Sequence, residues 1–490
     1  MTFKQKTIHG LFWSLFETVG NQGVQFIIGI ILARLLLPED YGITGVLAIF
    51  IGIAGVLVDS GFKTSIIRSK DLSGVDCSTI FYVNFLISIL IGLLIFLSGE
   101  SIARFFNKPE LVNVTRVFAI IPVINGLGLV QSALLFKNLQ FKLNAKISIA
   151  SNVVSGLIAL FLAFNGFSYW ALVWRALIGA GIYTILLWLT SNWRPSIVFS
   201  MIILKKHFKF SSRLLVGEIL ATLFNNIYSL IFGKFFSFKE LGFYTRGKGF
   251  VDTVTKTLSV AIQKVNTPLL SASGDDDNYK IAVYVKLLRA TTLLIFPASV
   301  LLVAVSEPMI IFLIGEKWRM AIPYVQILAI SGMIYPVLNA NYALYEVLGR
   351  SDIIIKQTII ARPMEIIILL ITVQFSAMTV AWGILFFGVF GLFLSFYFVE
   401  KVIDRNVSII MKALLPALTI SIVMGISVYF IGLILKNCLS SGILFGLQSI
   451  LGIIITILIF MLLKVREFEL IKTVILLRLD LFWKKSGVVK

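Results

Sequence analysis

Polar and ionisable residues recur at helical spacing inside strongly apolar stretches of this sequence. Glu17, Asn21 and Gln25 lie four residues apart, so they share one face of a helix. About 200 residues later, a second apolar stretch carries the same spacing in Glu218, Thr222 and Asn226. Carboxylates, amides and hydroxyls in such a stripe can hydrogen-bond a hydroxylated ligand or hold a cation.

A third stretch adds basic residues to this pattern. Its stripe contains Lys248, Asp252, Lys256, Ser259 and Gln263, and Lys264 follows directly. A further base, Arg175, lies alone in another apolar stretch. An ionisable group at mid-bilayer costs about 2.5–3.5 kcal/mol on the insertion scale, so such groups face a protein interior or water. We predict that the stripes form two walls of one wet cavity, where Arg175, Lys256 and Lys264 meet an anion.

Structural explanations compete with this prediction for several of these residues. Asp252 and Lys256 are four apart and could neutralise each other. Arg362 and Glu365, three apart, favour a structural ion pair. Asn21 and Gln25 could hold two helices together instead of contacting a ligand.

Composition places these stripes in a membrane. The chain has 490 residues, of which 58% are hydrophobic and 14% charged, and a mean hydropathy of +0.98. A soluble protein carries about 25% charged residues, so most of this surface must face lipid. The net charge of +19 fits basic loops against anionic lipid better than a nucleic-acid surface. With two cysteines, two histidines and no glycine-rich phosphate loop, neither a metal site nor a cofactor is expected.

A membrane span needs about 20 mostly apolar residues. Read this way, the sequence predicts an all-α polytopic membrane protein with about fourteen spans: 9–33, 41–59, 79–98, 111–135, 147–165, 168–190, 213–235, 250–270, 283–306, 322–347, 357–375, 379–399, 413–435 and 442–463. Lys and Arg concentrate in the loops on the same side of the membrane as the N-terminus. Because cytoplasmic loops carry the excess of positive charge, both termini are predicted to be cytoplasmic.

An internal repeat organises these spans. Leu32-Ala-Arg-Leu-Leu-Leu-Pro-Glu-Asp-Tyr-Gly42 corresponds, at an offset of 200, to Phe232-Gly-Lys-Phe-Phe-Ser-Phe-Lys-Glu-Leu-Gly242. Two lobes of six spans each would have equal orientation, as parallel repeats do. The predicted organisation is an N-terminal lobe (1–190), a basic cytoplasmic linker (191–212), a C-terminal lobe (213–400), two further helices (401–464) and a basic amphipathic tail (465–490).

These motifs resemble a known family. The first hairpin motif, followed by Asp59-Ser-Gly-Phe62, and in the second half Leu241-Gly-Phe-Tyr-Thr-Arg-Gly247 and Gly315-Glu-Lys-Trp318, are similar to the Wzx-type polysaccharide flippases. The branch is that of the WzxC- and TuaB-like exporters in the MOP superfamily, which also holds the MATE exporters. The resemblance implies two six-helix lobes that alternate between inward- and outward-open states.

The resemblance also implies a substrate and a location. The substrate would be an undecaprenyl-diphosphate-linked oligosaccharide, moved across the bacterial inner membrane by an ion gradient or the membrane potential. A polysaccharide polymerase and a chain-length regulator would be candidate partners beside the membrane lipids, and nucleic acid would not. Two alternatives stay open: a MATE-like exporter of small cations, and an integral-membrane polysaccharide polymerase.

Overall fold

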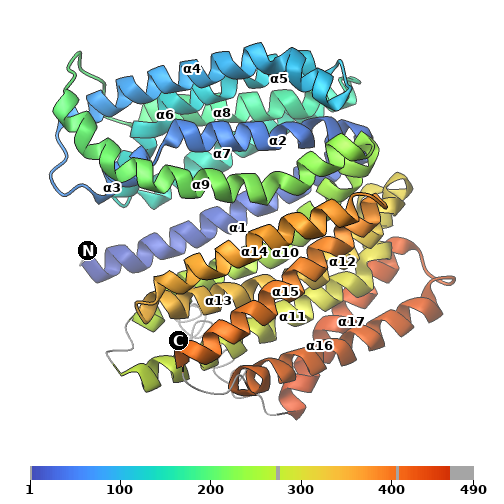
Figure 1. Cartoon of the computed structure of the whole chain (residues 1–490). Helices are drawn as coiled ribbons and strands as arrows, with labels where there is room; N and C mark the ends of the chain where they lie inside the picture. Colours follow the sequence, from blue (N-terminus) through green and yellow to red (C-terminus); the bar gives the residue numbers. More distant parts are fainter. Residues whose placement is uncertain (1–2, 272–275, 404–407, 464–490) are drawn as a thin grey trace, which may run out of the picture. The chain divides into compact units, whose positions relative to one another are not determined.

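The protein is built from helices throughout the part of the chain that the structure describes. The structure, a computed structural model, describes residues 3–271, 276–403 and 408–463, apart from the side chains of 3–12, 14–15, 209–210, 213–214, 260–269 and 271 (Figure 1). In order, the elements are α1 (Phe3–Leu35), α2 (Pro38–Asp59), α3 (Phe62–Arg68), α4 (Gly74–Phe106), α5 (Leu111–Phe118), α6 (Ile120–Lys137), α7 (Phe141–Phe164), α8 (Trp170–Thr190), α9 (Met201–Phe235), α10 (Phe238–Ser271), α11 (Asp277–Ile314), η1 (Glu316–Ala321), α12 (Ile322–Gly332), α13 (Ile334–Val347), α14 (Ser351–Thr372), α15 (Ala377–Ile403), α16 (Ser408–Leu435) and α17 (Ser441–Leu462). The predicted all-α class is confirmed, and the predicted tail 465–490 lies outside the described residues.

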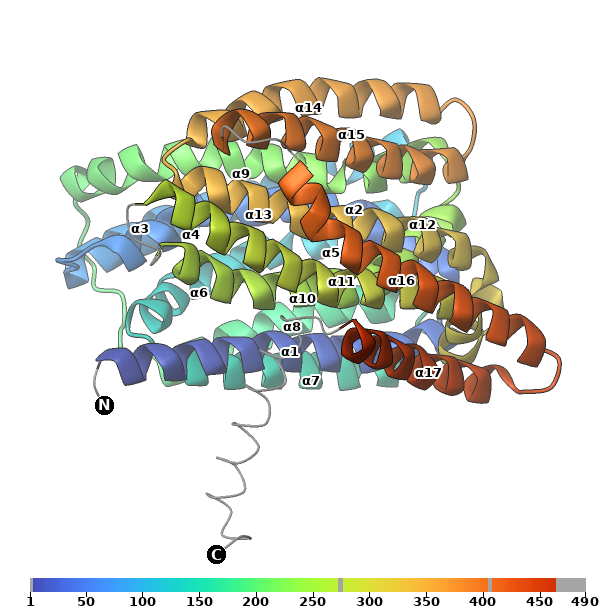
Figure 2. The ribbon, with the colours of Figure 1, turned by 90° about the horizontal axis from the view of Figure 1, so that it is seen from below.

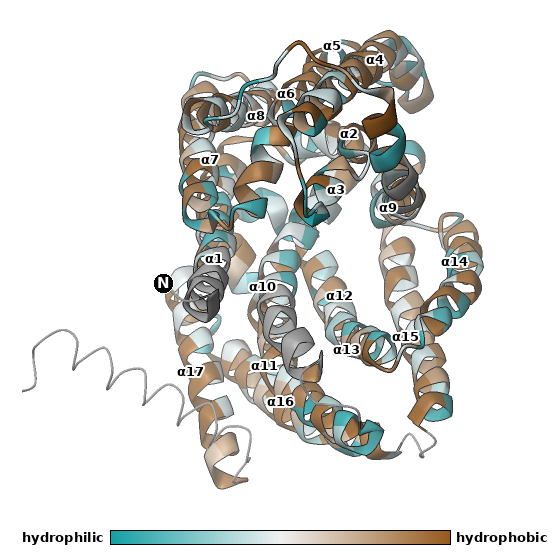
Figure 3. Ribbon diagram, turned by 90° about the vertical axis from the view of Figure 1, so that its left-hand side faces the viewer, coloured by the Kyte–Doolittle hydropathy of each residue, from teal (hydrophilic) through white to brown (hydrophobic). Residues whose placement is uncertain are grey.

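Twelve segments of the described chain are long and apolar enough to cross a membrane, so this is a multi-pass membrane protein. Apolar residues cover α4, α16 and α17 in Figure 3. The predicted count of fourteen is not confirmed. The spans predicted at 250–270 and 357–375 correspond to α10 and α14, which are long helices but carry too many charged and polar residues to join this set.

The helices form two compact units, Met1–Arg246 and Gly247–Lys490. In the first unit, α7 packs against α1 and α8, while α4 packs against α5 and α6. Helix α9 also belongs to this unit, where it lies along α2, α3 and α4. The lobe boundary at 191–212 remains a prediction.

The second unit is centred on α11, which packs against α12, α16 and α17, while α14 pairs with α15 (Figure 2). Its core encloses a polar contact chain in which Asn341 donates to Ser395 Oγ at 2.7 Å and Gln357 donates to Tyr345 Oη at 3.0 Å. Arg362 Nη1 donates to Glu365 Oε2 at 2.7 Å, the structural ion pair that the sequence favoured.

Local sequence determines where helix α2 begins. Pro38 occupies the first turn, where a missing N–H costs nothing, and Asp40 Oδ2 accepts from the Leu37 N–H at 2.7 Å. The loop after α4 is tied to this turn, because Lys108 Nζ lies 2.8 Å from Glu39 Oε1. The hydrogen bond to Glu39 raises the pKa of Lys108 above its usual value.

The two copies of the repeated hairpin contact each other reciprocally in the first unit. A Cβ at Gly42 would lie 1.9 Å from the Phe238 carbonyl oxygen, and one at Gly242 would lie 1.8 Å from the Pro38 carbonyl oxygen. The offset of 200 relates Pro38 to Phe238 and Gly42 to Gly242, so each contact is the counterpart of the other, as expected of a pseudo-two-fold interface. Only glycine permits this approach of one backbone to the other.

Candidate functional site

An open cavity of about 750 Å³ lies in the first unit, where it is lined by α1, α2, α5, α7 and α8. Its wall is rich in hydroxyl and amide groups, including Ser148, Ser151, Asn152 and Tyr183. Of its lining residues, Arg175 of α8 is the one that carries a full charge. The cavity therefore combines hydrogen-bonding groups with a single positive charge, which suits a polar anionic ligand.

The predicted stripe of α1 lies against a matching stripe of α7. Asn21 Nδ2 donates to Ser148 Oγ at 2.8 Å, and Asn152 Nδ2 donates to Asn21 Oδ1 at 2.8 Å. Asn21 is thus an interhelical contact, the structural alternative raised above. Gln25, one turn further along α1, is exposed and lines the cavity.

Glu17 of α1 is hydrogen-bonded to the same helix, α7. Asn144 Nδ2 donates to Glu17 Oε1 at 2.7 Å, and Tyr183 Oη donates to Asn144 Oδ1 at 2.9 Å. This α7 stripe was not among the predicted site residues, although Asn144, Ser148 and Asn152 repeat the same four-residue spacing. That spacing was the signal that could have revealed it.

A second base lies near Arg175. The Arg246 guanidinium lies 5.7 Å from the centre of the Tyr41 ring, and Arg175 is close enough to both residues to interact electrostatically. Arg246 also packs against Gly29, where a Cβ would lie 3.0 Å from its Nη1. Arg246 was not among the predicted site residues, although it stands in the motif Leu241–Gly247.

The stripe of α9 faces α2 beside the cavity. A Cβ at Gly52, which lines the cavity, would lie 3.1 Å from Thr222 Cγ2 and 3.7 Å from Asn226 Nδ2. Glu218 is exposed and lies within electrostatic range of Asp59 at the end of α2. The structure therefore gathers the predicted residues of α1, α8 and α9 into one unit.

The predicted residues of α10 belong to the second unit. Asp252 Oδ2 accepts from Lys256 Nζ at 2.9 Å and from Lys248 Nζ at 3.3 Å, so the neutralising contact weighed above is present. The side chains of Gln263 and Lys264 lie outside the described residues. A role in ligand binding for Asp252, Lys256, Gln263 and Lys264 remains a prediction.

Comparison with known proteins assigns the chain to a family. A family model described as "Polysaccharide biosynthesis protein" matches residues 31–323, more than half of the chain. The teichuronic acid biosynthesis protein TuaB of Bacillus subtilis strain 168 is 27% identical over 384 residues, covering 78% of this chain and 79% of its own. The lipopolysaccharide biosynthesis protein WzxC of Escherichia coli strain K12 is 25% identical over 448 residues, covering 90% of each chain.

Solved structures share the fold at lower identity. The inward-closed lipid II flippase MurJ superposes with a TM-score of 0.70 at 15% identity, covering 93% of this chain and 97% of its own. An inward-facing MATE multidrug transporter of the MOP superfamily gives 0.61 at 16% identity, covering 79% of this chain and 94% of its own. The chain therefore has the MOP transporter fold and belongs to the polysaccharide biosynthesis protein family.

Proposed function

We propose that this protein is a flippase for an undecaprenyl-diphosphate-linked oligosaccharide, the repeat unit of a lipopolysaccharide O-antigen, capsule or exopolysaccharide. The observation that carries the proposal is the open cavity around Arg175, whose polar groups lie on helices apolar enough for a membrane. Such a cavity can shelter a sugar and a diphosphate from lipid while the polyprenyl tail stays in the bilayer.

Each part of the substrate has suitable partners in this chain. Arg175 would donate charge-assisted hydrogen bonds to the diphosphate, and Lys256 and Lys264 would add positive charge from α10. The amides and hydroxyls that line the cavity would exchange hydrogen bonds with sugar hydroxyls. Glu17 and Glu218 would bind sugars or a coupling cation.

The protein would work by alternating access in the bacterial inner membrane, with both termini cytoplasmic. An interior-negative potential favours outward movement of an anion by about 2.3 kcal/mol per charge per 100 mV. This driving force needs neither a nucleotide nor a cofactor. A polysaccharide polymerase and a chain-length regulator are the partners expected to take up the flipped unit.

The test uses a strain that lacks its own flippase. Arg175→Ala should lower export of the repeat unit by at least about tenfold, because the diphosphate loses its charge-assisted hydrogen bonds. Arg175→Lys keeps the charge but not the planar fork, so it should restore part of the export. Arg104→Ala is the matched control, since the Arg104 side chain is 80% exposed and lies outside the cavity wall.

The leaflet in which intermediates accumulate separates the competing functions. A flippase defect leaves the lipid-linked unit on the inner leaflet, whereas a polymerase defect leaves it on the outer leaflet. Normal export by Arg175→Ala would remove Arg175 from the mechanism. Dye efflux without any effect on lipid-linked sugars would instead identify a small-cation exporter.

A further inference from the structure

The first twelve residues of α9 pack through one face of the helix against α3, α4 and the turn between α2 and α3. The Ser200 N–H, directly before α9, donates to Thr79 Oγ1 at 3.1 Å. His207 contacts α3 and α4, and Ser211 lies against Gly61, where a Cβ would be 3.0 Å from the Ser211 carbonyl oxygen. Because positions 207 and 211 are four residues apart, they lie on one face of the helix.

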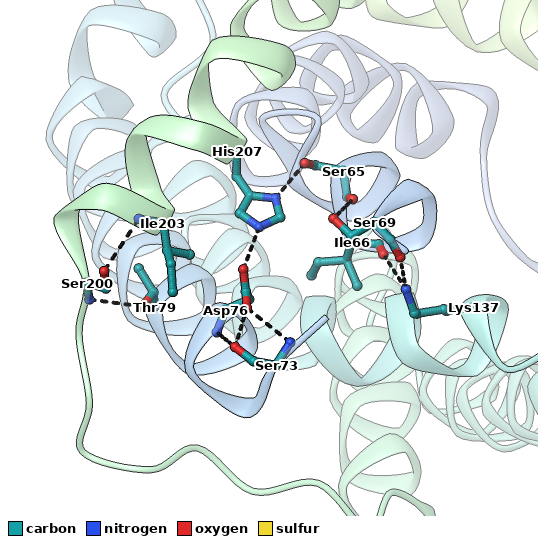
Figure 4. A network of polar contacts seen from close by, with 10 residues as sticks. All are labelled: Ser65, Ile66, Ser69, Ser73, Asp76, Thr79, Lys137, Ser200, Ile203 and His207. Atoms are coloured by element: carbon teal, nitrogen blue, oxygen red, sulfur yellow. Dashed lines mark hydrogen bonds and ion pairs between the residues drawn. The ribbon is translucent and has the colours of Figure 1, made fainter. Parts of the chain in front are cut away.

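His207 is the centre of this attachment, as Figure 4 shows. Its Nε2 lies 3.1 Å from Asp76 Oδ1, and its Nδ1 lies 2.7 Å from Ser65 Oγ. A carboxylate only accepts, so Nε2 carries a proton and donates to Asp76. The His207 side chain is 2% exposed, so both ring nitrogens depend on protein partners.

Both partners of His207 are held in place. Asp76 caps α4 together with Ser73, whose N–H donates to Asp76 Oδ2 at 3.0 Å and whose hydroxyl also contacts that oxygen. The end of α3 is fixed by Lys137 of α6, which donates to the Ser69 and Ile66 carbonyl oxygens. His207 therefore meets a fixed acceptor and a fixed hydroxyl, which together define one rotation of α9.

That rotation determines where the polar stripe of α9 points. His207 and Glu218 are eleven residues apart, and so are Ser211 and Thr222; eleven residues make about three turns of an α-helix. The attached face and the polar stripe are thus the same face. We propose that His207 is a positioning residue, which sets the rotation of α9 so that Glu218, Thr222 and Asn226 face α2 beside the cavity. The role of this position in export rests on the proposed transport function.

The test combines export with a measurement of helix position. In a background with Cys77→Ala and Cys438→Ala, Thr222→Cys reports the exposure of that face through its rate of labelling by a membrane-impermeant maleimide. His207→Leu should change this rate by at least about threefold and lower export by about tenfold in the chain with Thr222 intact, since displaced groups no longer meet the substrate in the required geometry. His207→Gln, which can donate to Asp76 and accept from Ser65, should restore both readouts.

Phe208→Leu is the control, because Phe208 is exposed on the adjacent face of the same helix. If His207→Leu reaches the membrane at normal amounts and both readouts match the parent protein, the proposal is wrong. If export falls while labelling at position 222 is unchanged, His207 acts in some way other than positioning. If His207→Leu fails to accumulate, Ser65→Ala, which removes one partner, must change the labelling rate relative to the parent protein, and an unchanged rate would contradict the proposal. The labelling result stands even if the transported substrate proves to be different.

Discussion

At the scale of single residues, the polar groups of the first unit form a shared network between α1, α7 and α8. Asn144 is its junction, because it donates to Glu17 and accepts from Tyr183. Its side chain is buried, so removing it would delete two hydrogen bonds from the interior of this network.

Asn144→Ala should therefore lower the stability of the purified protein. A double-mutant cycle with Glu17→Ala, which removes the acceptor, should give a coupling energy of about 0.6 kcal/mol and at most about 1.7 kcal/mol, the range of hydrogen bonds between membrane helices. Thermal unfolding in detergent measures this coupling. Asn165→Ala, an exposed position after α7, serves as the control, and additivity of Asn144→Ala and Glu17→Ala would contradict the contact.

At the scale of elements, the reciprocal contact of the two hairpins depends on two glycines. A methyl group at Gly42 or Gly242 would overlap the facing carbonyl group, so the α2 and α10 starts would have to separate. Overpacking of this kind costs about 1–3 kcal/mol.

Gly42→Ala and Gly242→Ala should each lower thermal stability and reduce export. Each helix provides its own control: a Cβ at Gly55 of α2 or Gly249 of α10 would meet nothing within 4 Å. Gly55→Ala and Gly249→Ala should be neutral or stabilising by up to about 1 kcal/mol, since alanine is the better helix former. Equal effects at all four positions would argue against the close crossing.

At the scale of the whole molecule, the membrane topology depends on whether α10 crosses the bilayer. The charge pattern of the loops predicts that it does, although α10 is more polar than the twelve candidate spans. A helix with charges along one face is compatible with a span when that face meets protein or water.

Cysteine labelling from outside intact cells tests this topology. Met320→Cys, exposed in η1, should react with an impermeant maleimide, and Tyr279→Cys, exposed at the start of α11, should not. Leu37→Cys, exposed between α1 and α2, is the positive control. The reverse pattern for positions 279 and 320 would show that α10 does not cross.

Much of the fold was predictable because membranes impose simple rules on sequence. The apolar segments predicted where helices form. The offset of 200 between Gly42 and Gly242 indicated a repeat, and in the structure the two copies of that repeat contact each other. Breaks within segments were not predicted: the span at 111–135 consists of α5 and α6, which meet at Ala119. Pro122, in the first turn of α6, has no N–H to donate to the Phe118 carbonyl, so a local signal for this break was present in the sequence although hydropathy does not show it.

For the candidate site, the sequence by itself determined which residues share a helix face, since the helical period is a local property. Tertiary structure alone decided which faces meet: that α7 supplies partners for Glu17 and Asn21, that Arg246 lies near Arg175, and that His207 fastens α9 to Asp76. These contacts join residues far apart in the chain, and their choice depends on the packing of several helices at once.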